Sequence, residues 1–210
     1  MGCQQNSKHP NIIIIFTDNQ GYGDLGCNGQ KKIRTPNIDS IANTGMRFTS
    51  HYSGQTVCTP SRASLMYGQH MGHCPIKSNS GESPSKGDFL LPQLFKNAGY
   101  KTGIIGKWGL MGKSWNDEKF QADYYPNNCG FDYWCGFESQ GYAHFYYPSR
   151  LLENKKFIHF PENEGIRSEG LYSPGKGTHA HDTFISKAEG FIQANKDAPF
   201  FLYIPFAIPH

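Results

Sequence analysis

The sequence predicts an α/β fold in which helices pack against a central, mostly parallel β-sheet. Two segments, 11–17 and 199–205, are apolar without alternation, which is typical of strands covered on both faces at the centre of a parallel sheet. Apolar residues over 184–192 recur at helical spacing and predict an amphipathic helix that Asp182 would cap. Strands that alternate with helices along a chain indicate a layered α/β architecture.

Local signals place the first elements after the opening strand. This strand is expected to stop at a turn over 18–21. Thr35 and Pro36 predict the start of a short helix, because Thr caps helix N-termini and Pro suits their first turn. Gly45 would end this helix, and alternation over 46–52 then predicts a strand.

The middle of the chain predicts two further helices, a strand and a long irregular segment. The helices are expected over 60–67 and 89–97, each closed by a glycine, and a short buried strand over 102–105. From 111 to 177 the chain is rich in Gly, Tyr, Asn and Pro, which predicts long loops with a hairpin at 154–155. Loops of this length in a compact domain are usually functional.

The composition argues against several classes of protein. The 210 residues carry a formal charge of +3, and Lys and Arg form no block longer than a pair, so no nucleic-acid partner is expected. The longest aliphatic run, 12–16, is too short to span a bilayer, so no transmembrane segment is expected. Six cysteines without a Cys-x-x-Cys pair argue against a structural zinc site. Cys27, Cys74 and Cys135 are expected to be buried free thiols.

Residues 1–10 are expected to form an N-terminal tail. They contain no apolar signal region, and Asn6 weakens a myristoylation motif at Met1-Gly2. The simplest interpretation is a cloned start on a mature protein whose leader was removed, and Cys3 would then fit a former lipid anchor. On this hypothesis the protein is exported, as a periplasmic or outer-surface lipoprotein of a bacterium.

Polar side chains follow three of the predicted strands. Asp18 and Asn19 come after the first strand, Lys107 after the middle strand and His210 after the last. Open α/β sheets bind ligands beyond the carboxyl ends of their strands, so these groups are expected to converge there. An ordinary turn would explain the polar residues after any one of these strands. It explains less well why polar residues follow all three strands.

The segment 57–68 predicts an anion-binding helix start. Thr59 is a candidate cap and Pro60 suits the first turn, so Cys58 would lie where free backbone amides and the helix dipole favour an anion. Arg62 lies one turn further and is able to reach back toward residue 58. These residues predict an oxyanion site with a nucleophile or an electrophile at position 58.

The same segment carries a family resemblance. Cys58-x-Pro60-x-Arg62, continued through Ala-Ser-Leu-Met to Gly68, resembles the signature of the formylglycine-dependent sulfatases, which belong to the alkaline phosphatase superfamily. Further matches lie at 12–29, 35–39, 45–48, 99–108 and 200–210. The chain resembles bacterial glycan sulfatases of this family, and the resemblance implies an α/β/α sandwich with a mostly parallel mixed sheet. Residues 11–210 would be the N-terminal portion of the catalytic domain, truncated before its C-terminal metal ligands and subdomain.

The resemblance implies a chemistry for residue 58. In these sulfatases a separate maturation enzyme, of the formylglycine-generating or the anaerobic type, oxidises the cysteine to an aldehyde, formylglycine. The hydrate of this aldehyde supplies the oxygen that attacks sulfur. Asp18, Asn19 and residue 58 would bind Ca²⁺, with Mg²⁺ as the alternative. The family usually has a second Asp at position 19, so Asn19 removes one negative charge from the metal site.

The resemblance also implies roles for other site residues. Arg62 would hold the hydrate, Lys107 would bind the sulfate oxygens, and His210 would protonate the leaving oxygen. Gly109 stands where many relatives have a histidine that helps to regenerate the aldehyde. His144 is predicted to enter the pocket and either replace that base or bind a sugar hydroxyl; a purely structural loop is the alternative.

The resemblance implies a sulfuric ester hydrolase that removes sulfate from a glycan. Similarity of the loop at 141–148 to glycan-directed sulfatases implies that this glycan contains galactose or N-acetylgalactosamine. Lys77 would meet a carboxylate or sulfate of this sulfated carbohydrate, with a solvated loop as the alternative. Two other interpretations stay open: a catalytically incomplete fragment or sulfoglycan-binding relative, and a phosphatase or phosphodiesterase of the same superfamily. Cys58 with Pro60 and Arg62 argues against the last, because those relatives use Ser or Thr with two metals.

Overall fold

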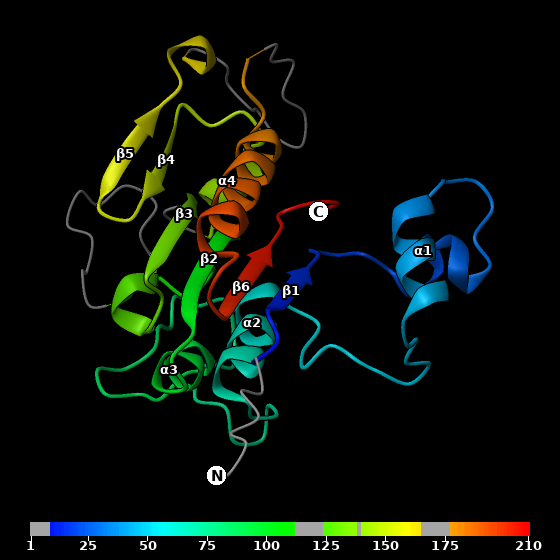
Figure 1. Cartoon of the computed structure of the whole chain (residues 1–210), viewed down its shortest axis with the longest axis horizontal. Helices are drawn as coiled ribbons and strands as arrows, with labels where there is room; N and C mark the ends of the chain where they lie inside the picture. The colour runs from blue at the N-terminus through cyan, green and yellow to red at the C-terminus, as the bar shows by residue number, and fades with distance from the viewer. Residues whose placement is uncertain (1–8, 112–123, 138–139, 165–176) are drawn as a thin grey trace, which may run out of the picture.

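Six strands and four α-helices form the framework of the computed structural model, which describes residues 9–111, 124–137, 140–164 and 177–210 (Figure 1). The strands are β1 (Ile12–Phe16), β2 (Lys101–Lys107), β3 (Tyr133–Phe137), β4 (Arg150–Glu153), β5 (Lys156–His159) and β6 (Phe200–Pro205). The helices are α1 (Pro36–Thr44), α2 (Cys58–Tyr67), α3 (Leu91–Asn97) and α4 (Ala180–Asn195). Cys3, on which the lipid-anchor hypothesis depends, lies outside the described residues.

The strands form one mixed, mostly parallel sheet in the order β1-β6-β2-β3-β4-β5. β1, β6, β2 and β3 run parallel, whereas β4 pairs antiparallel with both β3 and β5. Asn154 turns the β4–β5 hairpin with a φ of 53°, a left-handed conformation that Asn adopts more readily than most residues. The predicted fold class and the hairpin at 154–155 are confirmed.

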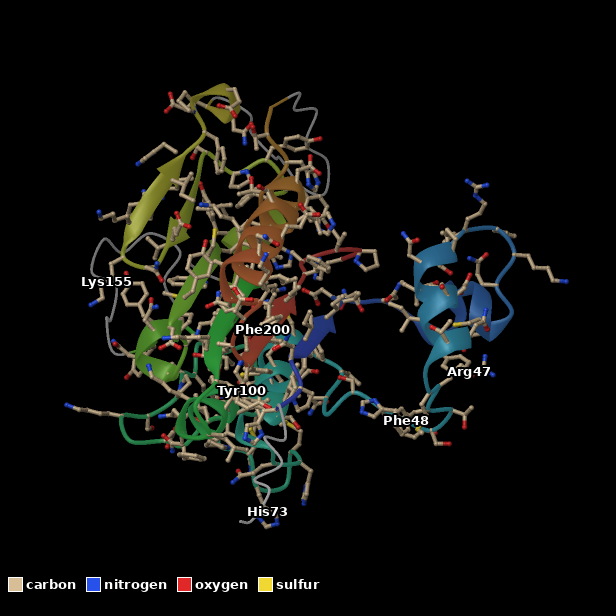
Figure 2. All side chains as sticks on the ribbon, in the orientation of Figure 1. Arg47, Phe48, His73, Tyr100, Lys155 and Phe200 are labelled. Carbon is tan, nitrogen blue, oxygen red and sulfur yellow. The ribbon has the colours of Figure 1, made fainter. Side chains whose placement is uncertain are left out.

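Helices cover both faces of the sheet and give the molecule three layers. Phe184 and Phe191 of α4 pack on one face, in the same cluster as Phe200 of β6. Phe201 and Tyr203 point to the other face, where α2 and α3 lie. Every residue of β6 is buried, so the unbroken apolar run at the end of the chain is explained by cover on both faces. Figure 2 shows Phe200 inside this packed body.

β1 differs from its prediction. It is the edge strand of the sheet rather than a central one, and Ile13 and Ile15 are 44% and 56% exposed. Ile12, Ile14 and Phe16 pack against the core on the other face. β1 is therefore apolar on both faces but covered on only one of them in the described part of the chain.

Two predictions of strands and loops are wrong. The segment 46–52 forms no strand; it is irregular, and its large apolar side chains are exposed. The predicted loop region over 111–177 contains β3, which pairs with β2 and was not predicted. Segment 46–52 alternates but pairs with no described strand, whereas β3 is a short apolar run (YWCGF) that the Gly-, Tyr- and Asn-rich composition around it obscured.

The starts of two helices also differ from their predictions. α2 begins at Cys58, so Thr59 lies within the helix instead of capping it. His179, not Asp182, caps α4, because its ring nitrogen accepts a hydrogen bond from the backbone N–H of His181 at 3.1 Å. The consequence for the site is that residue 58 is itself the first residue of a helix.

Residues 20–53, here called the arm, project from the sheet between β1 and α2 and carry α1 (Figure 1). Pro36 begins α1 as predicted. The Thr35 hydroxyl accepts from the N–H of Gly26 at 2.8 Å and donates to Asp39 at 3.0 Å. It therefore joins the helix to the preceding loop, and it makes no capping bond within the helix.

The described cysteines are all free thiols. Cys74 and Cys135 are buried as predicted, whereas Cys27 is only partly buried. Burial raises the pKa of Cys135 to about 12, which makes it an unreactive thiol. No helix in the described ranges has the length and apolar character needed to cross a bilayer.

Candidate active site

Three charged side chains meet at the carboxyl ends of β1 and β2. Lys107 Nζ lies 2.6 Å from Asp18 Oδ2, and an Arg62 guanidinium nitrogen lies 3.4 Å from the same oxygen. All three side chains are at most 5% exposed. The prediction that Asp18 and Lys107 lie close together is confirmed. β1 and β2 are parallel strands separated only by β6, so their carboxyl ends lie at the same edge of the sheet.

Arg62 connects α2 to these strand ends. Its guanidinium donates to the backbone carbonyl of Lys107 at 2.5 Å and to that of Phe206 at 3.4 Å. The guanidinium carbon also lies 5.6 Å from the centroid of the Phe16 ring, within the range of a cation–π contact. The hydrogen bonds described for Arg62 thus reach the strand ends, and none of them is the predicted contact with residue 58.

The charge on Lys107 depends on Asp18. Burial lowers the pKa of Lys107 and the neighbouring Arg62 lowers it further, whereas the Asp18 carboxylate raises it. A buried ammonium without a counter-charge tends to lose its proton. The contact with Asp18 therefore helps to keep a positive charge at this edge of the sheet.

Side-chain amides surround residue 58 at the start of α2. Asn79 accepts a hydrogen bond from the backbone N–H of Thr59 at 3.0 Å and so satisfies one of the free amides of the helix start. Its Nδ2 lies 3.5 Å from the sulfur of Cys58. Gln140 Nε2 lies 2.7 Å from the same sulfur. Two amide donors therefore face the reactive position of the helix.

A polar cleft of about 400 Å³ opens at residue 58. Its lining includes side chains from five separate parts of the chain: Asn19, Cys58, Asn79, Gln140, His144 and His210. This volume falls in the usual range of small-molecule sites. The structure thus brings four of the predicted site residues, Asn19, Cys58, His144 and His210, to one cleft.

His144 and His210 form a pair at the wall of this cleft. Their rings meet nearly edge to face with centroids 4.3 Å apart, and the Tyr146 hydroxyl donates to the His210 carbonyl at 2.5 Å. Burial lowers the pKa of His144, and electrostatic interactions with Lys107 and His210 lower it further. His144 is therefore neutral at pH 7 and is able to accept a hydrogen bond.

Lys77 is not brought to the cleft. It is exposed, and its backbone N–H donates to the Glu82 carboxylate at 2.9 Å. Its predicted contact with a glycan stays a prediction. Asn79 and Gln140, in contrast, line the cleft. The family resemblance implied that Asn79, on the same loop as Lys77, lies near the substrate, whereas it implied nothing for Gln140. An amide side chain has no spacing rule of its own, so only the fold reveals the position of Gln140.

The fold and the site together define a class of protein. It is an α/β protein in which a helix start at Cys58 and two buried cations, Arg62 and Lys107, lie at the carboxyl edge of the sheet, an arrangement suited to binding an oxyanion. The chain belongs to the sulfatase family, whose profile matches residues 10–210.

Individual relatives agree with this assignment. The chain is 31% identical to an N-acetylgalactosamine-6-O-sulfatase of Bacteroides thetaiotaomicron, over 95% of this chain and 48% of the relative. It is 32% identical to an ulvan-active sulfatase of Formosa agariphila, over 99% of this chain and 37% of the relative. The chain therefore spans about half or less of the length of these relatives.

Solved structures share the fold. One structure, from a study of glycosaminoglycan metabolism by Bacteroides thetaiotaomicron, matches with a TM-score of 0.75 at 26% identity, over 97% of this chain and 52% of the other. Another, in complex with its substrate D-glucosamine-2-N,6-O-disulfate, matches with a TM-score of 0.74 at 28% identity, over 97% of this chain and 35% of the other. The α/β/α sandwich implied by the sequence is confirmed.

Proposed function

We propose that this chain is the N-terminal part of an enzyme that hydrolyses a sulfate ester of a glycan. The observation that carries the proposal is the position of Cys58, which is the first residue of α2 and faces a polar cleft. A helix start and the nearby cations Lys107 and Arg62 favour a tetrahedral anion. The relatives named as sulfatases of sugars support a glycan that contains galactose or N-acetylgalactosamine.

In this proposal a maturation enzyme of the formylglycine-generating or the anaerobic type first oxidises Cys58 to formylglycine. When hydrated, this group supplies an oxygen nucleophile for sulfur and releases sulfate by re-forming its carbonyl. The surroundings of residue 58 fit the group, because the amide donors of Asn79 and Gln140 face its side chain. The distance of 2.7 Å from Gln140 Nε2 suits an oxygen acceptor.

Asp18, Asn19 and residue 58 would hold Ca²⁺, with Mg²⁺ as the alternative. Carboxylate and amide oxygens are the ligands these cations prefer, so the donors fit, but they are too few for the about six to eight ligands of Ca²⁺. No group of three or more His, Cys, Asp and Glu side chains suited to a metal occurs within the described ranges. The missing oxygens would come from the rest of the domain or from the substrate. The bound cation would offset the negative charge of the sulfate.

The chain's own side chains have complementary tasks in this proposal. Lys107 and Arg62 supply the buried positive charge that stabilises the sulfate oxygens. His210 is the proton donor to the leaving oxygen, since it lies in the lining of the same cleft as residue 58. His144, which is neutral at pH 7, accepts a hydrogen bond from a sugar hydroxyl.

The test compares matured proteins that do and do not extend past His210. We expect the extended protein to hydrolyse an aryl sulfate and a 6-sulfated N-acetylgalactosamine in the presence of calcium, and mass analysis to show conversion of Cys58. Cys58→Ala is expected to lower turnover by about a thousandfold or more. Unconverted Cys58 in a fully active protein would contradict the proposal, and faster hydrolysis of phosphate esters would favour the phosphatase alternative.

A sulfoglycan-binding protein without catalysis is the second candidate. The small number of metal donors at Asp18 and Asn19 favours it for the 210 residues on their own. Binding of a sulfated sugar by the extended protein without turnover, despite a converted residue 58, would support this candidate over the enzyme.

A further inference from the structure

Gly109 leaves a space beside the site that Gln140 fills. A Cβ placed on Gly109 would lie 2.9 Å from Gln140 Oε1 and 2.9 Å from Arg62 Cδ, both closer than side chains normally approach. Gly109 also has a φ of 74°, which disfavours any residue with a Cβ. The absence of a side chain at 109 and the position of the Gln140 amide are therefore structurally linked.

The Gln140 amide is placed for an oxygen atom on residue 58. Its Nε2 lies 2.7 Å from Cys58 Sγ. This separation is normal for an N–H···O hydrogen bond, whereas sulfur is a larger and weaker acceptor. Because a C–O bond is shorter than a C–S bond, an oxygen on the same Cβ would relieve this close contact and keep the hydrogen bond.

Two buried polar atoms next to Gly109 lack partners. Neither Gln140 Oε1 nor Arg62 Nε has a hydrogen-bond partner in the described part of the chain. These atoms lie 2.9 Å and 3.5 Å from the point where a Cβ of Gly109 would be. One is an acceptor and the other a donor, and leaving either unsatisfied is costly. Gln140 Oε1 is therefore a free acceptor on the same amide group whose Nε2 lies 2.7 Å from the side chain of residue 58.

We propose that Gln140 positions the hydrated form of residue 58, with Gly109 providing the space for its side chain. The Gln140 amide N–H donates to one oxygen of the hydrate, and Oε1 accepts from its other hydroxyl group. An aldehyde has no hydroxyl to donate, so Gln140 favours the hydrate over the aldehyde. The inference rests on the proposed function, because it requires an oxygen on residue 58.

The test uses the full-length matured protein and the variants Gln140→Leu and Gln140→Glu. Leucine has a similar size and no hydrogen-bonding group, whereas glutamate keeps the acceptor oxygens and loses the N–H donors. Gln193→Leu, on the exposed side of α4, is the matched control. Three quantities are measured: the converted fraction of residue 58 by mass, the rate at which an aminooxy probe labels its aldehyde, and kcat and KM on an aryl sulfate.

For Gln140→Leu we expect an unchanged converted fraction and labelling that is several-fold faster, because more of residue 58 is then aldehyde. We expect kcat to fall about tenfold, as for the loss of one hydrogen bond, with KM within about twofold. Gln140→Glu should also lower kcat, because the N–H donor is gone. It therefore gives an answer even if the leucine variant fails to fold.

If both variants have the labelling rate and the kcat of the unsubstituted protein, the proposed role of Gln140 is wrong. The proposed function is not affected by that result. An unsubstituted protein that is active but shows no aldehyde by mass or by probe would overturn both, because Gln140 would have no hydrate to hold. An equal effect in Gln193→Leu would show a general disturbance of the fold and would also overturn the proposal.

Discussion

The single carboxylate of Asp18 forms ion pairs with two buried cations, Lys107 and Arg62. Its Oδ2 lies 2.6 Å from Lys107 and 3.4 Å from Arg62, and these side chains are almost inaccessible to solvent. Two cations placed so close together would repel each other without it. When no sulfate is bound, the Asp18 carboxylate balances the charge of these two cations. The proposed substrate is an anion that would interact with the same two cations.

This arrangement predicts an asymmetric effect of substitution. Asp18→Asn should lower the free energy of unfolding by about 3–5 kcal/mol, because it leaves two buried positive charges unpaired. Adding Lys107→Met to it should recover more than about 1 kcal/mol of that loss. Urea denaturation of both single variants and the double variant in metal-free buffer measures this coupling. Strictly additive losses would show that the contact between Asp18 and Lys107 contributes nothing.

Residues that belong to a local pattern could be predicted, and those that depend on the fold could not. Cys58 and Arg62 lie in one short motif, and Asp18 and Lys107 each follow a strand that the apolar pattern predicts. Gln140 reaches residue 58 from a segment 82 positions away, and its amide fits many roles. Only the three-dimensional structure links it to the site.

At the scale of elements, α2 owes its end to a glycine that must adopt a left-handed conformation. Gly68 has a φ of 62° at the C-terminus of the helix, and its N–H bonds to the carbonyl of Leu65 at 3.4 Å. A Cβ on Gly68 would meet no atom within 4 Å. The cost of a side chain at this position is therefore a cost of backbone conformation alone.

A matched pair of substitutions separates this effect from side-chain size. Gly68→Ala should destabilise the protein by about 1–2 kcal/mol. Gly190→Ala adds the same methyl group inside α4, again with no atom within 4 Å, and should stabilise the protein by about 0.5–1 kcal/mol. Thermal or urea denaturation measures both. A loss of stability in both variants would mean that helix-end geometry does not explain the effect at Gly68.

Elements with a strong apolar pattern were predictable, whereas those that depend on distant partners were not. The strand over 199–205 and the helix over 184–192 are β6 and part of α4. β3 is also mostly apolar (YWCGF), but it is short and lies in a Gly-, Tyr- and Asn-rich region that resembles a loop, and its place between β2 and β4 is seen only in the fold. The segment 46–52 alternates like a strand, but no strand of the described sheet pairs with it.

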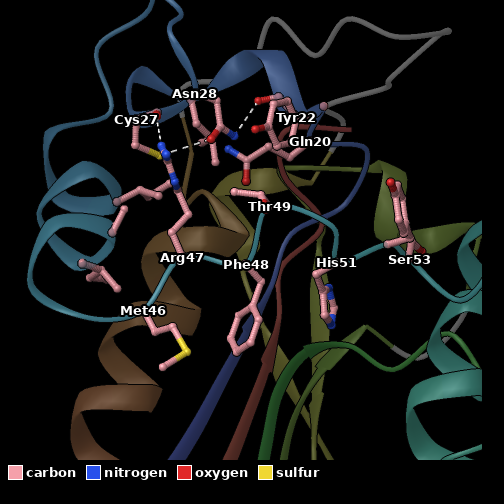
Figure 3. Close-up of a pocket in the computed structure, with 16 residues that line it drawn as sticks. Gln20, Tyr22, Cys27, Asn28, Met46, Arg47, Phe48, Thr49, His51 and Ser53 are labelled. Atoms are coloured by element: carbon pink, nitrogen blue, oxygen red, sulfur yellow. Dashed lines mark hydrogen bonds between the residues drawn. The ribbon is translucent and has the colours of Figure 1, made fainter.

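At the scale of the whole molecule, apolar side chains gather away from the packed core. The arm borders an open hollow of about 860 Å³, where Met46 and Phe48 extend beside His51 (Figure 3). Met46 and Phe48 are 78% and 68% exposed, and Ile41 on α1 is 65% exposed. The open face of β1 adds further apolar surface, and within the described ranges the outer edge of β1 is paired with no other strand. Exposure on this scale promotes association in water.

The 210-residue chain on its own is therefore expected to self-associate, and the edge strand β1 should contribute strongly. Replacing both Ile13 and Ile15 with Lys places charges on the open face of this strand and should reduce association. Leu94→Lys, at a residue of α3 that is 53% exposed, is the matched control and should have little effect. Size-exclusion chromatography with light scattering, over a tenfold or wider range of concentration, measures the mass of each variant. A monomer at all concentrations, or an equal effect of the control, would show that the β1 edge does not drive association.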